Sequence, residues 1–169
     1  MVAGLDFDIR PATPADAAQI LAIYTPYVTN TAISFEETPP SLGEMQGRIS
    51  DYAARYGYYV AERGGQILGY AYGSPYRPRH AYRFTAEVSV YLAPTAQGQG
   101  IGRALYDVLI TGLQTRGFHA LIGIVTLPNP ASAALHRALG FTEIGVTPQV
   151  GRKFDRWHDI AIFQRVLGL

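Results

Sequence analysis

The 169-residue chain contains no cysteine, which excludes disulfide bonds, thiolate nucleophiles and cysteine-ligated metals. It also lacks any apolar run that approaches the roughly 18 residues of a membrane-spanning helix. Basic residues never exceed two in a row and the formal net charge is +1, so nothing favours nucleic acid or an anionic membrane as a partner. Acids at Asp6 and Asp8 stand where a secretory signal would be basic. We therefore expect a cytoplasmic protein.

The composition is that of a single folded unit. Hydrophobic residues make up 48% of the chain and charged residues 16%, which is enough apolar material to fill a core. Repeats, low-complexity segments and linkers are missing from the sequence. We expect residues 1–169 to form one domain. The four histidines are scattered without a metal-binding spacing, so no metal is expected.

Hydrophobic periodicity and turn signals predict an α+β protein, a mixed sheet with helices on both sides. Helices are expected to start at Thr13-Pro14, to run from the capping box at Ser41 and Glu44 to about residue 56, and to cover 101–116 and 129–139. Strands are expected over residues 7–11, 58–63, 66–73, 84–92, 120–125, 142–154 and 158–166. Residues 74–83, rich in proline and arginine, are predicted to form a loop.

A glycine-rich turn joins the strand at 84–92 to the following helix. Gly98, Gly100 and Gly102 bring the backbone close to a ligand, and the free amides of the first helical turn would then bind pyrophosphate. An ATPase loop would need Lys and Ser/Thr after the last glycine, but Arg103 and Ala104 follow. A dinucleotide loop would need a third glycine at position 103 and an acid at the end of the next strand, and both are missing.

The loop Gln97-Gly98-Gln99-Gly100-Ile101-Gly102 resembles the Q/R-x-x-G-x-G/A pyrophosphate loop of the GNAT acyl-CoA N-acyltransferases. The segment that runs from Leu127-Pro-Asn-Pro to Leu139-Gly-Phe141 is similar to another element of that family, and the resemblance covers about residues 9–166. Within the family the chain looks most like the phosphinothricin and methionine sulfoximine or sulfone acetyltransferases. The resembling segments are 26–35, 79–91, 135–141 and 157–159.

This resemblance implies the GNAT fold and acetyl-CoA as co-substrate. The strand that precedes the loop would pair with the pantetheine amides like an added strand, and Arg103 would pair with a phosphate. The implied cofactor-binding residues are Val90, Tyr91, Leu92, Gln97, Gly98, Gln99, Gly100, Ile101, Gly102, Arg103, Asn129 and Ser132.

Glu87 is the candidate general base. Strand alternation places Glu87, Ser89 and Tyr91 on one face, and Val88 and Val90 on the other. An amine with a pKa of about 10 is mostly protonated at neutral pH, so a carboxylate that acts directly or through water has a proton to remove. The matching glutamate of the phosphinothricin acetyltransferases implies the same role.

Two further catalytic functions are expected. The resemblance implies that the backbone N–H of Val90 or its neighbour stabilises the oxyanion, in a strand splayed from the next by a bulge. His136 stands where many relatives carry a tyrosine that protonates the thiolate; it could act as acid or base, or be structural. Tyr91 is the alternative acid.

Arg77, Arg79 and Arg83 lie just before Glu87, and guanidinium groups bind carboxylates at two points. An amino-acid acceptor therefore suits this loop. The candidate substrate residues are Phe35, Arg77, Arg79, Tyr82, Arg83, Glu87, Val88 and Ser89.

We hypothesise direct transfer of acetyl from acetyl-CoA to the α-amine of a small amino-acid analogue. The acceptor could instead be a protein N-terminus, a polyamine or an aminoglycoside, although a cationic acceptor would avoid the arginines. A non-catalytic acyl-CoA sensor is a third hypothesis. By analogy with its relatives the chain is expected to be a homodimer.

Overall fold

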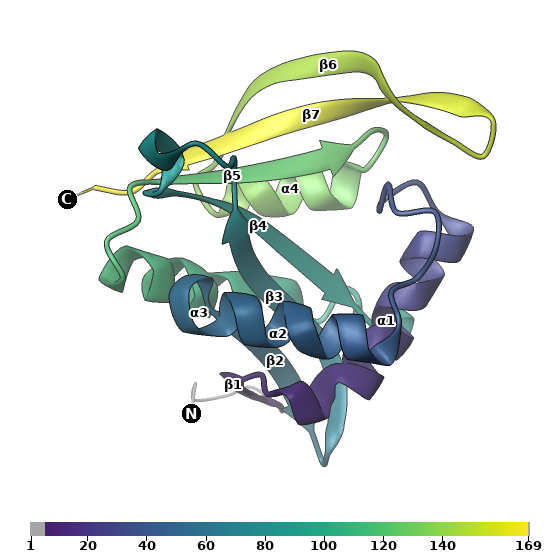
Figure 1. Cartoon of the computed structure of the whole chain (residues 1–169), viewed down its shortest axis with the longest axis vertical. Helices are drawn as coiled ribbons and strands as arrows, with labels where there is room; N and C mark the ends of the chain where they lie inside the picture. The colour runs from purple at the N-terminus through teal and green to yellow at the C-terminus, as the bar shows by residue number, and fades with distance from the viewer. Residues whose placement is uncertain (1–5, 169) are drawn as a thin grey trace.

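The computed structural model describes residues 6–168, in which one twisted sheet contains all seven strands (Figure 1). The order across the sheet is β1-β2-β3-β4-β5-β7-β6, and every neighbouring pair is antiparallel except β4 and β5. The strands are β1 Asp8–Pro11, β2 Tyr58–Arg63, β3 Gln66–Pro75, β4 Thr85–Leu92, β5 Ala120–Thr126, β6 Thr142–Lys153 and β7 Arg156–Val166. The predicted mixed sheet is thus confirmed.

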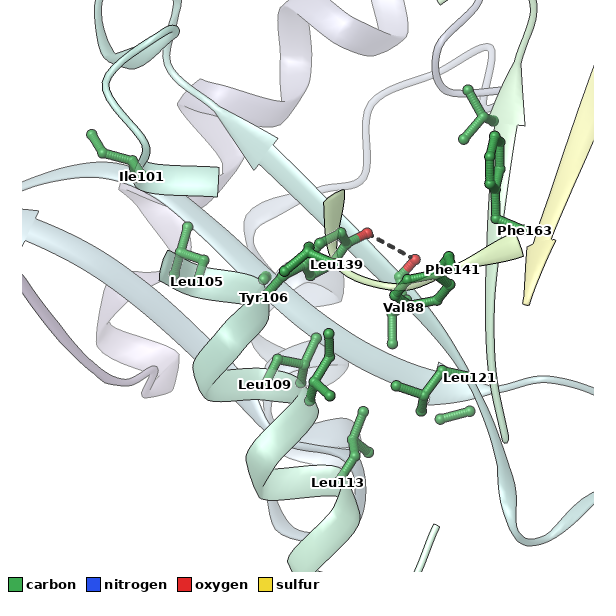
Figure 2. Packing of buried hydrophobic residues seen from close by; sticks show 14 of the residues in the cluster. Val88, Ile101, Leu105, Tyr106, Leu109, Leu113, Leu121, Leu139, Phe141 and Phe163 are labelled. Atoms are coloured by element: carbon green, nitrogen blue, oxygen red, sulfur yellow. Dashed lines mark hydrogen bonds between the residues drawn. The ribbon is translucent and has the colours of Figure 1, made fainter. Parts of the chain in front are cut away.

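Helices cover both faces of the sheet. On one face α1 (Ala17–Asn30) and α2 (Leu42–Tyr56) pack on side chains of β2 and β3 such as Val60 and Tyr70. On the other face α3 (Ile101–Thr115) buries Leu105, Leu109 and Leu113 against Val88 and Leu121, and α4 (Pro130–Ala138) completes the layer (Figure 2). An amphipathic helix needs such an apolar stripe to bury against a sheet.

The predicted helix starts differ in accuracy. The capping box of α2 is confirmed: Ser41 N donates to Glu44 Oε2 at 2.6 Å, and Glu44 N donates to Ser41 Oγ at 3.2 Å. At the first predicted start, Pro14–Asp16 form a short 3-10 turn and α1 begins only at Ala17. The loop predicted for residues 74–83 is shorter than expected, because β3 extends to Pro75 and His80–Tyr82 form another 3-10 turn.

The feature that positions the site is the divergence of β4 from β5. The two strands pair only from Thr85 to Glu87 on β4 and from Ala120 to Ile122 on β5. Beyond these residues both strands continue, but they separate and leave a gap between them (Figure 1). A parallel sheet satisfies its backbone groups only where neighbours pair, so on the side of the gap the separated half of β4 has no partner strand. Tyrosine hydroxyls bond two of its carbonyls there, those of Val88 and Leu92.

Candidate active site

The gap between β4 and β5 is a pocket at the centre of the sheet. Its lining residues come from β4, β5, α3, the start of α4 and the segment after α1, and they are Ile33, Val88, Ser89, Val90, Tyr91, Tyr106, Ile124, Val125, Thr126, Asn129, Ser132 and His136. The structure therefore brings seven of the residues predicted from the sequence to one place: Val88, Ser89, Val90, Tyr91, Asn129, Ser132 and His136. The pocket lies between the two separated strands and is open to solvent.

Val90 turns its backbone polar groups toward this gap. Ala93 N donates to Leu68 O of the β3 side, and Phe84 O accepts from His119 N of the β5 side. Since alternate residues of a strand face opposite neighbours, Val90 shares the orientation of Phe84. The β3–β4 register runs without interruption, so the splay needs no bulge in β4 and that part of the expectation is wrong.

The glycine loop lies between the 3-10 turn Pro94–Ala96 and the first residue of α3. Gly98 and Gly100 have φ values of 73° and 77°, and an added Cβ at either would meet no atom within 4 Å. Open space beside left-handed glycines, in front of the free amides of α3, suits a pyrophosphate. Gly102 differs: it is buried, and an added Cβ would lie 3.5 Å from the side chains of Leu92 and Leu135, so this glycine serves the packing of the helix.

Polar side chains of the loop are only partly free. Gln99 folds back, its Nε2 donating to Thr95 O at 2.6 Å. Gln97 is exposed. The Arg103 side chain is 60% exposed and only 3.9 Å from Asp107, a loose contact that a phosphate could replace.

Asn129 and Ser132 border the gap at the start of α4. Asn129 caps the helix, because Ser132 N donates to Asn129 Oδ1 at 3.1 Å. The Ser132 carbonyl in turn accepts a hydrogen bond from His136 Nδ1 at 2.8 Å. Both residues thus have structural duties in addition to facing the pocket.

His136 is 3% exposed and lies among the rings of Tyr106, Phe141 and Phe163. Burial lowers its pKa, which favours the neutral imidazole. The proton of that neutral ring belongs on Nδ1, since the Ser132 carbonyl can only accept. Nε2 then carries a lone pair 3.5 Å from the Tyr106 hydroxyl. In this state His136 accepts a proton and has none to donate to the gap.

Sequence reasoning missed Tyr106 and Gly123, which complete the surroundings of His136. Tyr106 is buried on α3, and its hydroxyl donates to Val88 O at 3.3 Å (Figure 2). A Cβ at Gly123 of β5 would overlap the His136 ring, with Cδ2 only 2.6 Å away. The spacing of Gly102 and Tyr106, one helical turn, was a usable signal. The glycine in a β-branched strand was another.

Glu87 occupies the last paired residue of β4, just before the gap opens. Its side chain is half-buried, and within residues 6–168 it makes no hydrogen bond or ion pair. Burial raises the pKa of the Glu87 carboxyl above its ordinary value. A carboxylate with raised pKa and free lone pairs is suited to accept a proton.

Tyrosines gather around Tyr91, which shares the α1/α2 face of β4 with Glu87. Tyr91 contacts the rings of Tyr24, Tyr27 and Tyr70 at centroid distances of 5.0, 5.1 and 5.4 Å, and burial raises its pKa well above 10. Tyr72, opposite Ser89 on β3, has its pKa raised by burial to about 12. The hydroxyl groups of Tyr91 and Tyr72 therefore stay protonated at neutral pH, so they add polar groups to this face but no charge.

The predicted substrate residues before β4 lie apart from the gap. Arg77, Arg79 and Tyr82 line a separate shallow depression with Pro78. The guanidinium of Arg77 lies over the Tyr76 ring at 5.1 Å, and that of Arg83 over Phe84 at 4.4 Å. The structure thus does not bring these arginines together with the residues that line the gap.

Phe35 lies in the segment between α1 and α2 and is not among the residues that line the gap. Its ring packs on the backbone of Gly151 in β6 and lies 6.2 Å from the ring of His158 in β7. Next to it Ile33 lines both the gap and a larger groove with Trp157 and Asp159.

The described residues also bear on two other functions, the binding of a metal and the crossing of a membrane. Within residues 6–168 no three His, Cys, Asp or Glu side chains are grouped so that they could hold a metal ion. The helices of this part of the chain are also too short or too polar to cross a membrane.

The fold, the splayed strands and the glycine loop define a class, the GNAT acyltransferases, and comparison with known proteins agrees. Residues 9–162 match the family model described as "Acetyltransferase (GNAT) domain", so the chain belongs to the GNAT acetyltransferase family. It is an N-acetyltransferase by family.

Particular relatives are similar over most of the chain. The phosphinothricin N-acetyltransferase of Alcaligenes faecalis is 47% identical, with 94% of this chain and 82% of the relative covered. The L-methionine sulfoximine/L-methionine sulfone acetyltransferase of Pseudomonas paraeruginosa is 40% identical, with 92% of each covered. The crystal structure of a phosphinothricin acetyltransferase from Sinorhizobium meliloti, in complex with AcCoA, is 43% identical with a TM-score of 0.92, covering 97% and 90% of the chains.

Proposed function

We propose that the protein transfers acetyl from acetyl-CoA to the α-amino group of a small amino-acid analogue of the phosphinothricin or methionine sulfoximine type. The observation that carries this proposal is the position of Glu87, an unpaired, half-buried carboxylate on the last residue of β4 that pairs with β5, directly before the residues that line the gap. The names of the relatives support the acceptor class. The AcCoA complex of a structural relative supports the co-substrate.

The residues present suit acetyl-CoA. The left-handed glycines and the α3 amides would hold the pyrophosphate, with Arg103 beside them. The unpaired backbone of Val90 would bind the pantetheine arm as a strand would. Acetyl-CoA supplies an acyl group on a good leaving thiolate, so the protein needs to provide only position and proton transfer.

Glu87 takes the amine proton, directly or through water. Its raised pKa brings its basicity closer to that of the amine than an ordinary carboxylate would be. Transfer is direct, because the chain has no cysteine to carry an acyl group. The Val90 N–H is the donor for the carbonyl oxygen, where negative charge develops.

A tyrosine hydroxyl is the better proton source for the leaving thiolate. Neutral His136 holds its one ring proton against Ser132 O, whereas Tyr106 and Tyr91 line the gap and keep their protons. His136 then serves as the acceptor beside Tyr106. We therefore assign His136 to proton acceptance and orientation.

The acceptor carboxylate requires a cation that the gap itself does not contain. Arg77 and Arg79 are exposed guanidinium groups on the loop that leads into β4, and movement of that loop would bring them toward a bound amino acid. The stacking of Arg77 on Tyr76 is weak enough to exchange for a carboxylate.

Turnover with an acceptor panel tests the function. Because the protein lacks cysteine, a thiol reagent reports only released CoA. We expect CoA release and an N-acetylated product with phosphinothricin, methionine sulfoximine or methionine sulfone. Release with none of these, but with a peptide N-terminus, spermidine or kanamycin, would reassign the acceptor. Acetyl-CoA binding by calorimetry without any turnover would make the protein a sensor.

We also propose a homodimer. Exposed apolar side chains gather on the β6–β7 hairpin, where Ile144, Val146, Val150, Phe154 and Trp157 are each about half exposed. Patches of this kind mark protein interfaces. Light scattering after size exclusion should give twice the 18.4 kDa monomer mass; a monomer at micromolar concentration would refute it.

A further inference from the structure

The chain has a single lysine among its 14 basic side chains, and this lysine is buried. Lys153 ends β6 at the tip of the β6–β7 hairpin and is 3% exposed. Its ammonium donates to three backbone carbonyls, those of Val28, Ser34 and Glu36, at 2.6, 2.7 and 2.7 Å. These carbonyls belong to the last turn of α1 and to the segment that follows it, more than a hundred residues away in sequence. We call this arrangement the Lys153 clamp.

The chemistry of the clamp explains why a lysine is needed here. An ammonium is a compact charge with three donors, and each of the three finds one carbonyl. A guanidinium is planar and larger, so its N–H groups cannot reach three carbonyls that converge on a single nitrogen position. In the described part of the chain no carboxylate forms an ion pair with Nζ, so carbonyl dipoles, including the negative end of α1, stabilise the charge at close range. The carboxylates of Glu36 and Glu37 add to this from farther away. Burial lowers the pKa of Lys153 accordingly.

The segment held by the clamp forms one wall of the active site. Phe35 lies between two of the clamped carbonyls, with its ring on Gly151, and Ile33 borders the gap. The side chains of Ser34 and Glu36 both bond the Tyr24 hydroxyl, at 2.7 and 2.6 Å. The Tyr24 ring contacts Tyr91 of β4 edge-on. The hairpin tip is thus linked to the strand that carries Glu87.

The turn beside Lys153 is strained. Lys153 pairs with Arg156, and the two residues between them, Phe154 and Asp155, have φ values of 52° and 56°. Turns of this conformation favour glycine and asparagine. Such strain persists only where the surrounding contacts fix the backbone, and the three bonds of Lys153 are among these contacts.

We propose that Lys153 is a positioning residue that locks the β6–β7 hairpin onto the segment after α1 and so sets the acceptor wall of the active site. The kinetic part of this inference rests on the proposed acetyl transfer. It assigns the clamp to acceptor binding, because its partners flank Phe35 and Ile33, whereas the glycine loop at the start of α3 is not among them.

Lys153→Met tests the clamp by keeping the stem and removing the charge and donors. We expect the acceptor KM to rise by about tenfold or more, from the loss of charge-assisted hydrogen bonds, with the acetyl-CoA dissociation constant unchanged. Lys153→Arg should restore little, since its fork does not fit three convergent carbonyls. Arg152→Met, a neighbouring exposed cation paired only with Asp155, is the matched control and should behave as wild type.

Gly151→Ala probes the same wall without touching Lys153. An added Cβ would overlap the Phe35 ring and displace the segment, so the acceptor KM should again rise while acetyl-CoA binding stays normal. This variant decides the question if Lys153→Met does not fold. A wild-type acceptor KM in a folded Lys153→Met, or in Gly151→Ala when that is the folded variant, would overturn the proposal.

Hydrogen exchange separates failure of the clamp from failure of the proposed function. If wild-type protein acetylates no acceptor, amide exchange over residues 31–37 still reports the clamp. We expect faster exchange there in Lys153→Met than in Arg152→Met, and equal exchange over residues 97–106. Equal exchange over 31–37 in the two variants would refute the clamp. In wild-type protein a lysine-selective reagent should modify Lys153 far more slowly than the N-terminal amine; equal rates would contradict its burial.

Discussion

The two sides of the proposed site are built in different ways. The acyl side comprises the gap between β4 and β5, the glycine loop and α4, which come from residues 88–138 except that Ile33 also lines the gap. The acceptor side joins residues 31–36 to residues 151–158. The arginine-containing loop 77–83, which precedes Glu87 in the chain, is counted with this side. Backbone conformation shapes the first side, and a few side-chain contacts hold the second. A conserved reaction with a variable acceptor would need this division, because walls held by side chains change by single substitutions.

Glu87 is the last residue of β4 that pairs with β5, and its loss should give the largest effect. Glu87→Gln keeps the shape and removes the base, so we expect kcat to fall by about 100-fold or more while the acetyl-CoA dissociation constant stays constant. A half-buried carboxylate without a partner also costs stability when ionised. The variant should therefore melt at a higher temperature than wild type at neutral pH. A near-normal kcat would remove Glu87 from the role of base.

The acyl side should be disturbed next most strongly at Gly123. In Gly123→Ala the new methyl group overlaps the His136 ring, which must move together with Tyr106. We expect a loss of about 1–3 kcal/mol in the free energy of unfolding and a fall of kcat by about tenfold or more. Gly145→Ala on β6 is the control, because nothing lies within 4 Å of its added Cβ. Equal stability of the two variants by denaturant titration would contradict the packing around His136.

A smaller effect should separate the cofactor loop from the acceptor. Gly100 has a φ of 77°, and alanine in that conformation costs about 1–2 kcal/mol. If the loop relaxes to escape this strain, the KM for acetyl-CoA should rise by about tenfold with an unchanged acceptor KM. Gly64→Ala carries similar strain in the β2–β3 turn, with open space around it, and should alter neither KM. A raised acceptor KM in Gly100→Ala would mean that the two sides are not separate.

The smallest effect is expected at Arg103, whose side chain is 60% exposed. Arg103→Met removes one screened phosphate contact, so the acetyl-CoA KM should rise by about two- to fivefold. The increase should shrink with added salt, because exposed charges are screened. An increase that is independent of ionic strength would show that packing and not charge was lost.

The acyl side, shaped by backbone conformation, is easier to predict from the sequence than the acceptor side, which is held by long-range side-chain contacts. The glycine loop, the α4 cap at Asn129 and the Ser132–His136 pair are local patterns, and each was visible in the order of residues. Gly123 and Tyr106 each carry a local signal, but they meet His136 only through the packing of three elements, and that contact is not visible in the order of residues. The arginines cluster in sequence but lie apart from the gap in space.

Lys153 shows the limit most clearly. Its partners lie at residues 28–36, and only the fold brings them together. Its one visible sign in the sequence was compositional, a single lysine in a chain that otherwise uses arginine. Long-range side-chain contacts of this kind follow from the sheet order, in which the last two strands curl back toward the first helix (Figure 1).

The most direct test of the central claim is the pH dependence of kcat/KM for phosphinothricin in wild type and Glu87→Gln. The base must be ionised to work, and burial raises the pKa of Glu87, so wild-type kcat/KM should fall with decreasing pH at values above the ordinary carboxylate range. The variant should lack this acidic limb and stay uniformly slow. An identical acidic limb in both proteins, or equal rates, would contradict the account.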